Sequence, residues 1–194
     1  AAPLTKYSAT ITDGERINEF VDRAVKIATN GYPGAVHLSL PVDIMFSHFA
    51  EDAGRDERPF DLSMQLPARA WPEPARLQQL LHKLNAAKRP VLIGGHGVWW
   101  AKAEAKLEEA GQLLGIPVFN IPYHQKLLGE ECEAYMGLAD IHQYHPSADA
   151  FRDADLVLMV GGRLDNQMNF GNPPLFPSSA ELVCVNGSHE EIEF

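Results

Sequence analysis

The sequence lacks the features that would direct it to nucleic acid or to a membrane. Its 16 lysine and arginine residues form no run, and 26 aspartate and glutamate residues outnumber them, so the formal net charge is −10. A surface that follows phosphates needs clustered basic side chains, and anionic bilayer surfaces attract the same residues. No apolar stretch approaches the roughly 20 residues of a membrane-spanning helix. We therefore expect a protein that binds neither nucleic acid nor membranes.

Cysteine is scarce as well. Cys132 and Cys184 are the only two, and neither belongs to a C-x-x-C pair. Two distant cysteines are typical of free thiols in a reducing compartment. The first residues, "AAPLTKYSAT", show no basic segment followed by an apolar one, as a secretory signal would. We expect a cytoplasmic protein.

The motifs of several enzyme classes are missing too. The sequence contains no G-x-S-x-G nucleophile elbow, no H-E-x-x-H zinc motif and no P-loop. No residue has the sequence neighbours of a nucleophile or a general base. We therefore predict no catalytic residue and no metal ligand within the chain, which leaves a scaffold for binding.

The pattern of what is present divides the chain into three segments. In residues 1–46, an apolar stripe at helical spacing follows "TDGE", which has the form of a capping box and places the helix start near Asp13. "GAVHLSLP" then alternates as a single strand does. Residues 47–72 are rich in charge and proline without sustained periodicity, which predicts a linker between two domains.

Residues 73–194 alternate helical patterns with apolar strands. Helices are predicted from Pro74, from about Trp100 to Leu114 with Gly115 as the stop, and in "PSADAFRDA". The predicted strands lie in "RPVLIGGHG", "IPVFNIP", "AYMG", "DLVLMVGG" and "ELVCVNG". Continuous apolar strands between helices are typical of a parallel sheet covered on both faces. We predict the α/β class, with a doubly wound, Rossmann-like parallel sheet.

Both ends of the chain suggest a piece of a longer polypeptide. One helix and one strand cannot form a sheet domain by themselves. At the other end, "SHEEIEF" opens as a helix should but stops after barely one turn. We expect the 194 residues to be part of a larger protein.

Glycines follow three of the predicted strands: "GGHG" at 94–97, "GGRLD" at 161–165 and "VNGS" at 185–188. In open parallel sheets, ligands lie beyond the carboxyl ends of the strands, where glycine lets the backbone approach a phosphate. Arg163 could pair with a phosphate and Asp165 with a ribose hydroxyl. Asn186 stands after the last strand, where we expect the ribose-binding side chain of a dinucleotide fold.

Each of these features also has a plainer interpretation. A glycine pair after a strand often makes only a tight turn, and Arg163 could pair with Asp165 or Asp155. "GGHGVW" does not complete the G-x-G-x-x-G fingerprint of dinucleotide-binding folds. The residues alone leave nucleotide binding and a structural role open.

The order of several segments carries a resemblance. "ATNGYPGAVHLSLPVDI" comes first, and the linker, "KRPVLIGGHGVWWAKAEAKL", "LGIPVFNIP", "AYMGL", "DADLVLMVGGRLD" and "VCVNGSHEEI" follow it. This order resembles the end of the pyrimidine-binding domain and then the central domain of thiamine-diphosphate-dependent enzymes. The group includes acetolactate synthase, 2-hydroxyacyl-CoA lyase and benzaldehyde lyase, and "RLDNQMNFGNPP" is similar to the latter two. The resemblance covers essentially the whole chain.

The resemblance implies a large enzyme that holds thiamine diphosphate and magnesium between two other domains. Such an enzyme makes or breaks a carbon–carbon bond next to a carbonyl. Its activating glutamate would precede this chain, and its magnesium–diphosphate motif would follow it. The implied partners are the missing parts of the pyrimidine-binding domain and the diphosphate-binding domain, in a homo-oligomer such as a dimer or tetramer. Residues 1–46 would end the first domain, and residues 73–194 would be the central one.

The central domain of this group is a six-stranded doubly wound fold that holds FAD, ADP or the adenosine of CoA, or nothing. Flavin-binding members usually have arginine where Gln167 stands and aspartate where Asn186 stands, so an adenosine-only or vestigial site is an open alternative to FAD. Carried over by motif, the implied nucleotide contacts are Gly95, Gly97, Ile121, Pro122, Gly137, Leu138, Gly161, Arg163, Asp165 and Asn186.

A second hypothesis needs no larger enzyme. A stand-alone adenosine- or FAD-binding module, of the electron-transfer flavoprotein type, would also have nucleotide-type strand ends without catalytic residues. The length of the natural gene product separates the two hypotheses.

Overall fold

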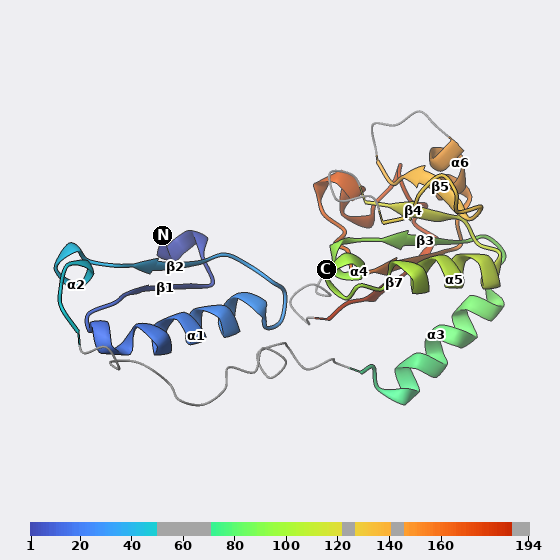
Figure 1. Cartoon of the computed structure of the whole chain (residues 1–194). Helices are drawn as coiled ribbons and strands as arrows, with labels where there is room; N and C mark the ends of the chain where they lie inside the picture. The colour runs from blue at the N-terminus through green and yellow to red at the C-terminus, as the bar shows by residue number, and fades with distance from the viewer. Residues whose placement is uncertain (50–70, 122–126, 141–145, 188–194) are drawn as a thin grey trace. The chain divides into compact units, whose positions relative to one another are not determined.

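The computed structural model describes residues 1–49, 71–121, 127–140 and 146–187. The chain divides into two compact units, unit 1 (residues 1–69) and unit 2 (residues 70–194), which we describe separately (Figure 1). Residues 50–70 of the predicted linker lie outside the described residues. The domain boundaries at residues 46 and 73 stay predictions, as does the helix at 188–194, which is likewise not described.

Unit 1 is a β-α-β motif. Strands β1 (Tyr7–Thr10) and β2 (Val36–Ser39) pair in parallel, and helix α1 (Ile17–Thr29) connects them. A short helix, α2 (Val42–Met45), follows, and 3-10 turns lie at Ala2–Leu4 (η1) and Gly14–Arg16 (η2). The prediction of a single strand in this region is wrong. The segment "YSAT" is short and half polar, and it becomes a strand only because β2 pairs with it.

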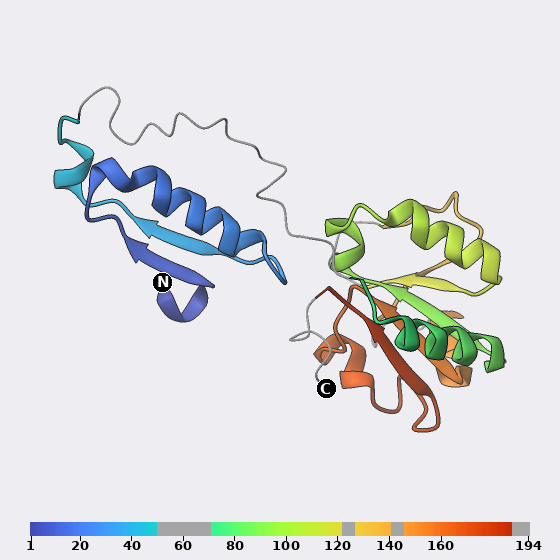
Figure 2. The same cartoon turned by 90° about the horizontal axis from the view of Figure 1, so that it is seen from below.

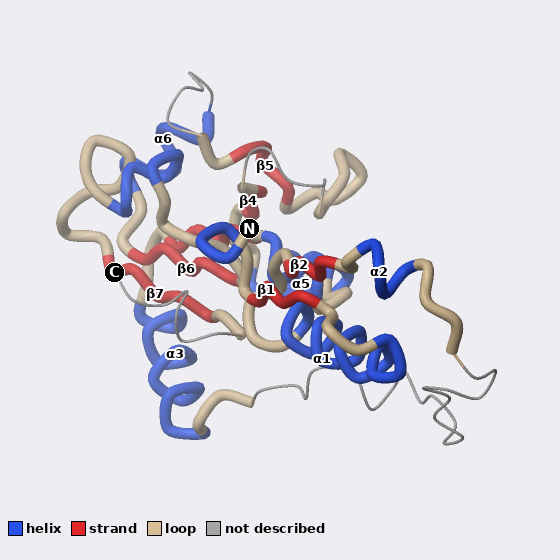
Figure 3. Tube along the Cα trace, turned by 90° about the vertical axis from the view of Figure 1, so that its left-hand side faces the viewer, coloured by secondary structure: helices blue, strands red, loops and turns tan. Residues whose placement is uncertain are grey.

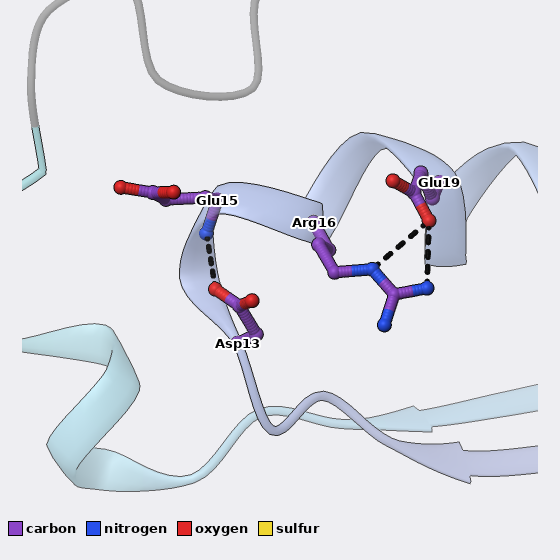
Figure 4. Close-up of polar contacts among 4 residues, drawn as sticks. All are labelled: Asp13, Glu15, Arg16 and Glu19. Atoms are coloured by element: carbon purple, nitrogen blue, oxygen red, sulfur yellow. Dashed lines mark hydrogen bonds and ion pairs between the residues drawn. The ribbon is translucent and has the colours of Figure 1, made fainter.

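The predicted helical start near Asp13 is that of the 3-10 turn η2, and α1 follows it at Ile17 without a side-chain cap of its own. In place of Thr12 of the predicted capping box, η2 is capped by Asp13. Its carboxylate accepts a hydrogen bond of 3.0 Å from the backbone N–H of Glu15 (Figure 4), which satisfies one of the amides that a first helical turn leaves unpaired. One turn later, Arg16 Nη2 lies 2.8 Å from Glu19 Oε2, and this contact lowers the pKa of the Glu19 carboxyl. Both side chains are exposed, so the ion pair contributes little to stability.

Unit 2 is a parallel sheet between two layers of helices (Figures 1 and 2). The strands are β3 (Pro90–Gly94), β4 (Val118–Asn120), β5 (Tyr135–Leu138), β6 (Leu156–Val160) and β7 (Glu181–Val185). The helices are α3 (Pro74–Ala86), α4 (His96–Trp100), α5 (Glu104–Leu114), α6 (Pro146–Asp153) and the 3-10 segment η4 (Asn166–Gly171). The strand order is β5-β4-β3-β6-β7, and every neighbouring pair is parallel. This is the order of the first five strands of a doubly wound sheet, so the predicted fold class is confirmed.

The sheet is buried on both faces, as its continuous apolar strands predict. On one face, Leu92 and Leu158 pack against α3, α4 and α5. On the other face, Phe151 of α6 and Phe176, which follows η4, form a row of aromatic rings with Phe119 of β4. Phe151 lies 4.6 Å from Phe119 and 5.3 Å from Phe176, measured between ring centroids. Figure 3 shows β6 and β7 side by side, and an ion pair from Lys83 of α3 to Glu181 joins that helix to β7.

The helix predicted from about Trp100 to Leu114 ends as predicted but begins later, at Glu104, and a separate short helix precedes it. Helix α4 ends at Trp100, and α5 begins at Glu104. Between them Lys102 adopts a left-handed conformation with φ of 52°. The segment "WWAKAEAKL" contains no glycine or proline that would announce this break. The predicted stop at Gly115 is confirmed, because its φ of 62° is the left-handed C-cap that glycine adopts without steric cost.

Asp155 fixes the entrance of β3 to that of β6. Its carboxylate accepts hydrogen bonds from the backbone N–H of Lys88 (2.7 Å) and of Arg89 (2.9 Å). These two bonds, the first foremost, hold the pKa of Asp155 below its usual value. Because the carboxylate form accepts both bonds, ionised Asp155 links the loop that leads into β6 to the loop that leads into β3, although the two loops are far apart in the sequence.

Candidate functional site

The carboxyl ends of β3 and β6 lie next to each other, at the point where the strand order reverses. Open α/β sheets hold their ligands outside this point. The glycine loops at 94–97 and 161–162 both lie there, as the sequence predicts. We call this region the carboxyl edge.

The two glycine loops touch each other through their backbones. Gly95 N donates to Val160 O (2.9 Å), and Gly97 N donates to Gly161 O (2.7 Å). A Cβ atom added at Gly95 would lie 2.4 Å from the Cα of Gly162, and one at Gly97 would lie 2.7 Å from the Cα of Gly161. Any side chain at these positions would therefore push the loops apart, which explains the glycines in structural terms.

These contacts bear on how a nucleotide diphosphate could fit the carboxyl edge. The backbone N–H of Gly95 and of Gly97 each already donates to a carbonyl, and Gly161 N donates to Val185 O (2.8 Å). The three amides are therefore engaged within the protein and do not face a phosphate. Contact between a nucleotide and these glycines stays a prediction, and the side chains around them are the better match to a charged ligand.

Those side chains come from the ends of β6 and β7. Arg163 is exposed and Asp165 is half-buried, two and four residues after the glycine at 161. An exposed guanidinium can donate to a phosphate through two N–H groups. Asn186 Nδ2 donates to Gly162 O (3.2 Å), and Asn186 Oδ1 accepts from Gly187 N (2.8 Å). Asn186 thus holds the end of β7 against the loop of β6.

The other predicted contacts lie at the ends of β4 and β5. Ile121 is buried, and its N–H donates to Gly94 O (3.0 Å). Its side chain reaches the β6 loop, since a Cβ at Gly162 would lie 2.4 Å from Ile121 Cδ1. Gly137 and Leu138 are part of β5, one strand further from the reversal point. Pro122 lies outside the described residues.

A buried amide at the end of β4 was not predicted. Asn120 is 1% exposed, and neither its Nδ2 nor its Oδ1 has a hydrogen-bond partner of standard geometry. The Tyr135 hydroxyl lies near this amide. Burial raises the pKa of Tyr135, and the proximity of Asn120 only partly opposes that shift. The only sign of this site in the sequence is that Asn120 is the one polar residue in the apolar segment "VFNI", and the sequence does not show that its amide is buried.

Two further features of the described residues limit the site. They contain no group of three or more His, Cys, Asp or Glu side chains that could hold a metal ion, and none of their helices is long and apolar enough to cross a membrane. A groove of about 370 Å³ lies at the entrance of β3 and β4, between Arg89, Gly115 and Asp153. It is at the opposite end of the strands and is not part of the carboxyl edge.

Comparison with known proteins places this architecture in a family. A family model described as "Thiamine pyrophosphate enzyme, central domain" matches residues 77–193, more than half of the chain. The chain is 26% identical over 203 residues to a 2-hydroxyacyl-CoA lyase of Arabidopsis thaliana, covering 98% of this chain and 32% of the relative. It is also 26% identical over 193 residues to an acetolactate synthase large subunit of Cyanidium caldarium, covering 98% and 32%.

Solved structures show the same fold. A thiamine diphosphate-dependent 4-hydroxybenzoylformate decarboxylase of Rhodococcus jostii RHA1 superposes with a TM-score of 0.72 at 20% identity, covering 98% of this chain and 35% of that one. The chain spans about a third of the length of the curated relatives it matches. With the fold, the strand order and the match over residues 77–193 in agreement, the chain belongs to the thiamine pyrophosphate enzyme family and carries its central domain.

Proposed function

We propose that this chain is part of a cytoplasmic thiamine-diphosphate-dependent lyase or synthase that makes or breaks a carbon–carbon bond next to a carbonyl. The observation that carries the proposal is the extent of the matches: nearly the whole chain aligns with about a third of a 2-hydroxyacyl-CoA lyase and of an acetolactate synthase subunit. Unit 1 would be the last β-α-β part of the pyrimidine-binding domain. Unit 2 is the central domain.

In this proposal the chain supplies a scaffold and no catalytic residue. Bound thiamine diphosphate, with magnesium, supplies the carbanion chemistry, and we expect both to be held by parts of the enzyme outside these residues. The complete enzyme would be a homo-oligomer, a dimer or a tetramer.

We further propose that the carboxyl edge binds an adenosine diphosphate group, as part of ADP, CoA or FAD. Support comes from its position at the reversal of strand order, where α/β sheets hold ligands. Arg163 would pair with the diphosphate, and Asp165 and Asn186 would face the ribose. The side-chain amide of Asn186 already bonds to Gly162 O and Gly187 N, so it would contribute through its remaining N–H and lone pair.

The catalytic proposal is tested on the complete natural gene product. Acetolactate formation from pyruvate and cleavage of a 2-hydroxyacyl-CoA are measured with thiamine diphosphate and magnesium, after their removal, and after their return. We expect turnover of one of these substrates that is lost with the cofactor and restored with it. A complete gene product of only 194 residues, or a complete protein that does not bind thiamine diphosphate, would contradict the proposal.

The nucleotide proposal is tested by calorimetric titration of the chain with ADP and with FAD. Arg163→Gln should weaken ADP binding by about tenfold, because a charge-assisted bond to a phosphate is lost. The matched control is Arg152→Gln in α6, an exposed arginine whose ion pair is with Asp149. Equal affinity of wild type and Arg163→Gln, or no binding by the wild type, would refute the proposed site.

A further inference from the structure

The segment that follows β6 contains a strained turn. Asn169, Phe170 and Gly171 adopt left-handed backbone conformations, with φ of 48°, 51° and 76°. Glycine takes this conformation freely and asparagine tolerates it, but a bulky side chain such as phenylalanine does so rarely and at an energetic cost. Phe170 is therefore the residue of this turn that needs an explanation.

The turn is held in place by its two asparagines. Asn169 Nδ2 donates to Asn172 O (3.1 Å) and to Pro173 O (2.8 Å). In the opposite direction, Asn172 Nδ2 donates to Asn169 O (3.2 Å) and to Phe170 O (3.2 Å). Strained backbone persists only where the surrounding structure enforces it, and such sites cluster where proteins bind ligands or partners.

The strain is not offset by burial of the aromatic ring. Phe170 is 55% exposed, whereas Met168, two residues earlier, is fully buried in the core. A turn that served only packing would point its largest apolar side chain inward. Here the phenyl ring is presented to solvent by a backbone that disfavours it.

The turn lies next to the residues proposed to bind the nucleotide. Phe170 N donates to Asp165 O (2.8 Å), so the backbone at Phe170 is fixed to the Arg163–Asp165 loop. On its other side the turn rests on the sheet, because a Cβ at Gly171 would lie 2.7 Å from Leu182 of β7 and 3.2 Å from Leu164.

We propose that Phe170 is the platform on which the adenine ring of the bound nucleotide stacks. This inference rests on the proposed nucleotide site and adds the part that recognises the base. Stacking needs an accessible aromatic ring on an anchored backbone. The ring of Phe170 is accessible, and its backbone is bonded to Asp165 O and to the side chain of Asn172. Arg163 and Asp165 hold the diphosphate and ribose, and the ring of Phe170 covers the base that projects beyond them.

The test compares two ligands on two forms of the chain. Phe170→Asn keeps the turn, because asparagine adopts left-handed conformations more readily than phenylalanine, and its melting temperature should not fall. We expect its affinity for ADP to drop by about tenfold or more, the effect of losing one base–aromatic stack. Affinity for ribose 5-phosphate, which has no base, should not change. Phe170→Tyr should bind ADP as the wild type does.

The control is Leu113→Asn, which replaces another exposed apolar side chain, 77% exposed, on α5; both affinities should remain at the wild-type value. If wild type binds ADP and Phe170→Asn binds it equally well, the stacking inference is overturned while the nucleotide site stands. An equal loss for ADP and ribose 5-phosphate would also overturn it, because the turn would then act on the site as a whole. Absence of ADP binding by wild type would remove the site and the inference together.

Discussion

Replacing Gly95 with alanine tests the contact between the two glycine loops at the carboxyl edge. The added Cβ would lie 2.4 Å from the Cα of Gly162 and 2.5 Å from the carbonyl oxygen of Gly161. Both are backbone atoms, so no side-chain rotation relieves the overlap. Ordinary contact begins at 3.4 Å, so the loops must separate by roughly 1 Å, the difference between 3.4 and 2.4 Å.

The magnitude follows from what that separation breaks. The bonds from Gly95 N to Val160 O and from Gly97 N to Gly161 O, now 2.9 and 2.7 Å, would both lengthen beyond useful range. Each is worth about 1 kcal/mol net, and overpacking in a rigid place costs about 1–3 kcal/mol. We expect Gly95→Ala to lower the free energy of unfolding of unit 2 by about 3 kcal/mol or more.

The assay uses the tryptophans, since all three, Trp71, Trp99 and Trp100, belong to unit 2. Urea unfolding followed by their fluorescence therefore reports on unit 2 alone. The control is Gly187→Ala, because a Cβ added at Gly187 meets nothing within 4 Å. If the unfolding midpoint of Gly95→Ala matches that of Gly187→Ala, the loops are not in contact and the structural reason given for these glycines is wrong.

Three more predictions concern unit 2. Because the pKa of Asp155 is lowered in the folded chain, ionised Asp155 stabilises the fold fully above the ordinary value of about 4, and this stabilisation is lost as pH falls through the lower folded-state pKa. The difference in urea midpoint between wild type and Asp155→Asn should therefore shrink between pH 5 and pH 2. A constant difference would contradict this. Burial raises the pKa of the Cys184 thiol, and Cys132 is buried. Mass spectrometry should therefore show slow alkylation of both thiols by iodoacetamide at pH 7.5 and fast alkylation in urea. Rapid labelling of the folded chain would disprove this prediction. Gly115→Ala should cost about 1–2 kcal/mol in the same urea assay, because φ is 62° there although space is free, and an unchanged midpoint would exclude the left-handed cap.

Patterns within short segments predicted most of unit 2, because its strands are continuous apolar runs and its helices carry clear stripes. The strands β3 and β6 and the stop at Gly115 follow directly from local residues. Strand β1 does not, since "YSAT" depends on a partner beyond α1. The break at Lys102 escaped prediction for the opposite reason: every residue near it favours a helix, and the loop geometry of the tertiary structure overrides that preference.

At the candidate site, the sequence predicted where the glycines lie on the sheet better than it predicted what they do there. The glycines at 95, 97 and 161 were expected at one edge of the sheet, and they are there. That they contact each other depends on distances between strands, which no residue pattern encodes. The burial of Asn120 and the left-handed backbone of Phe170 are likewise products of packing.

The small sheet of unit 1 has a practical consequence for work with the purified chain. Within the described residues, β1 and β2 pair only with each other, so each leaves a row of backbone amides and carbonyls that another polypeptide can match. Val42 and Phe46, which follow β2 in the chain, are 65% and 76% exposed and add apolar surface on which another chain can pack. The apparent molar mass of the chain measured by light scattering should therefore rise with its concentration, and a constant value would contradict this. Dilute samples are the ones in which unit 2 can be studied as a monodisperse species.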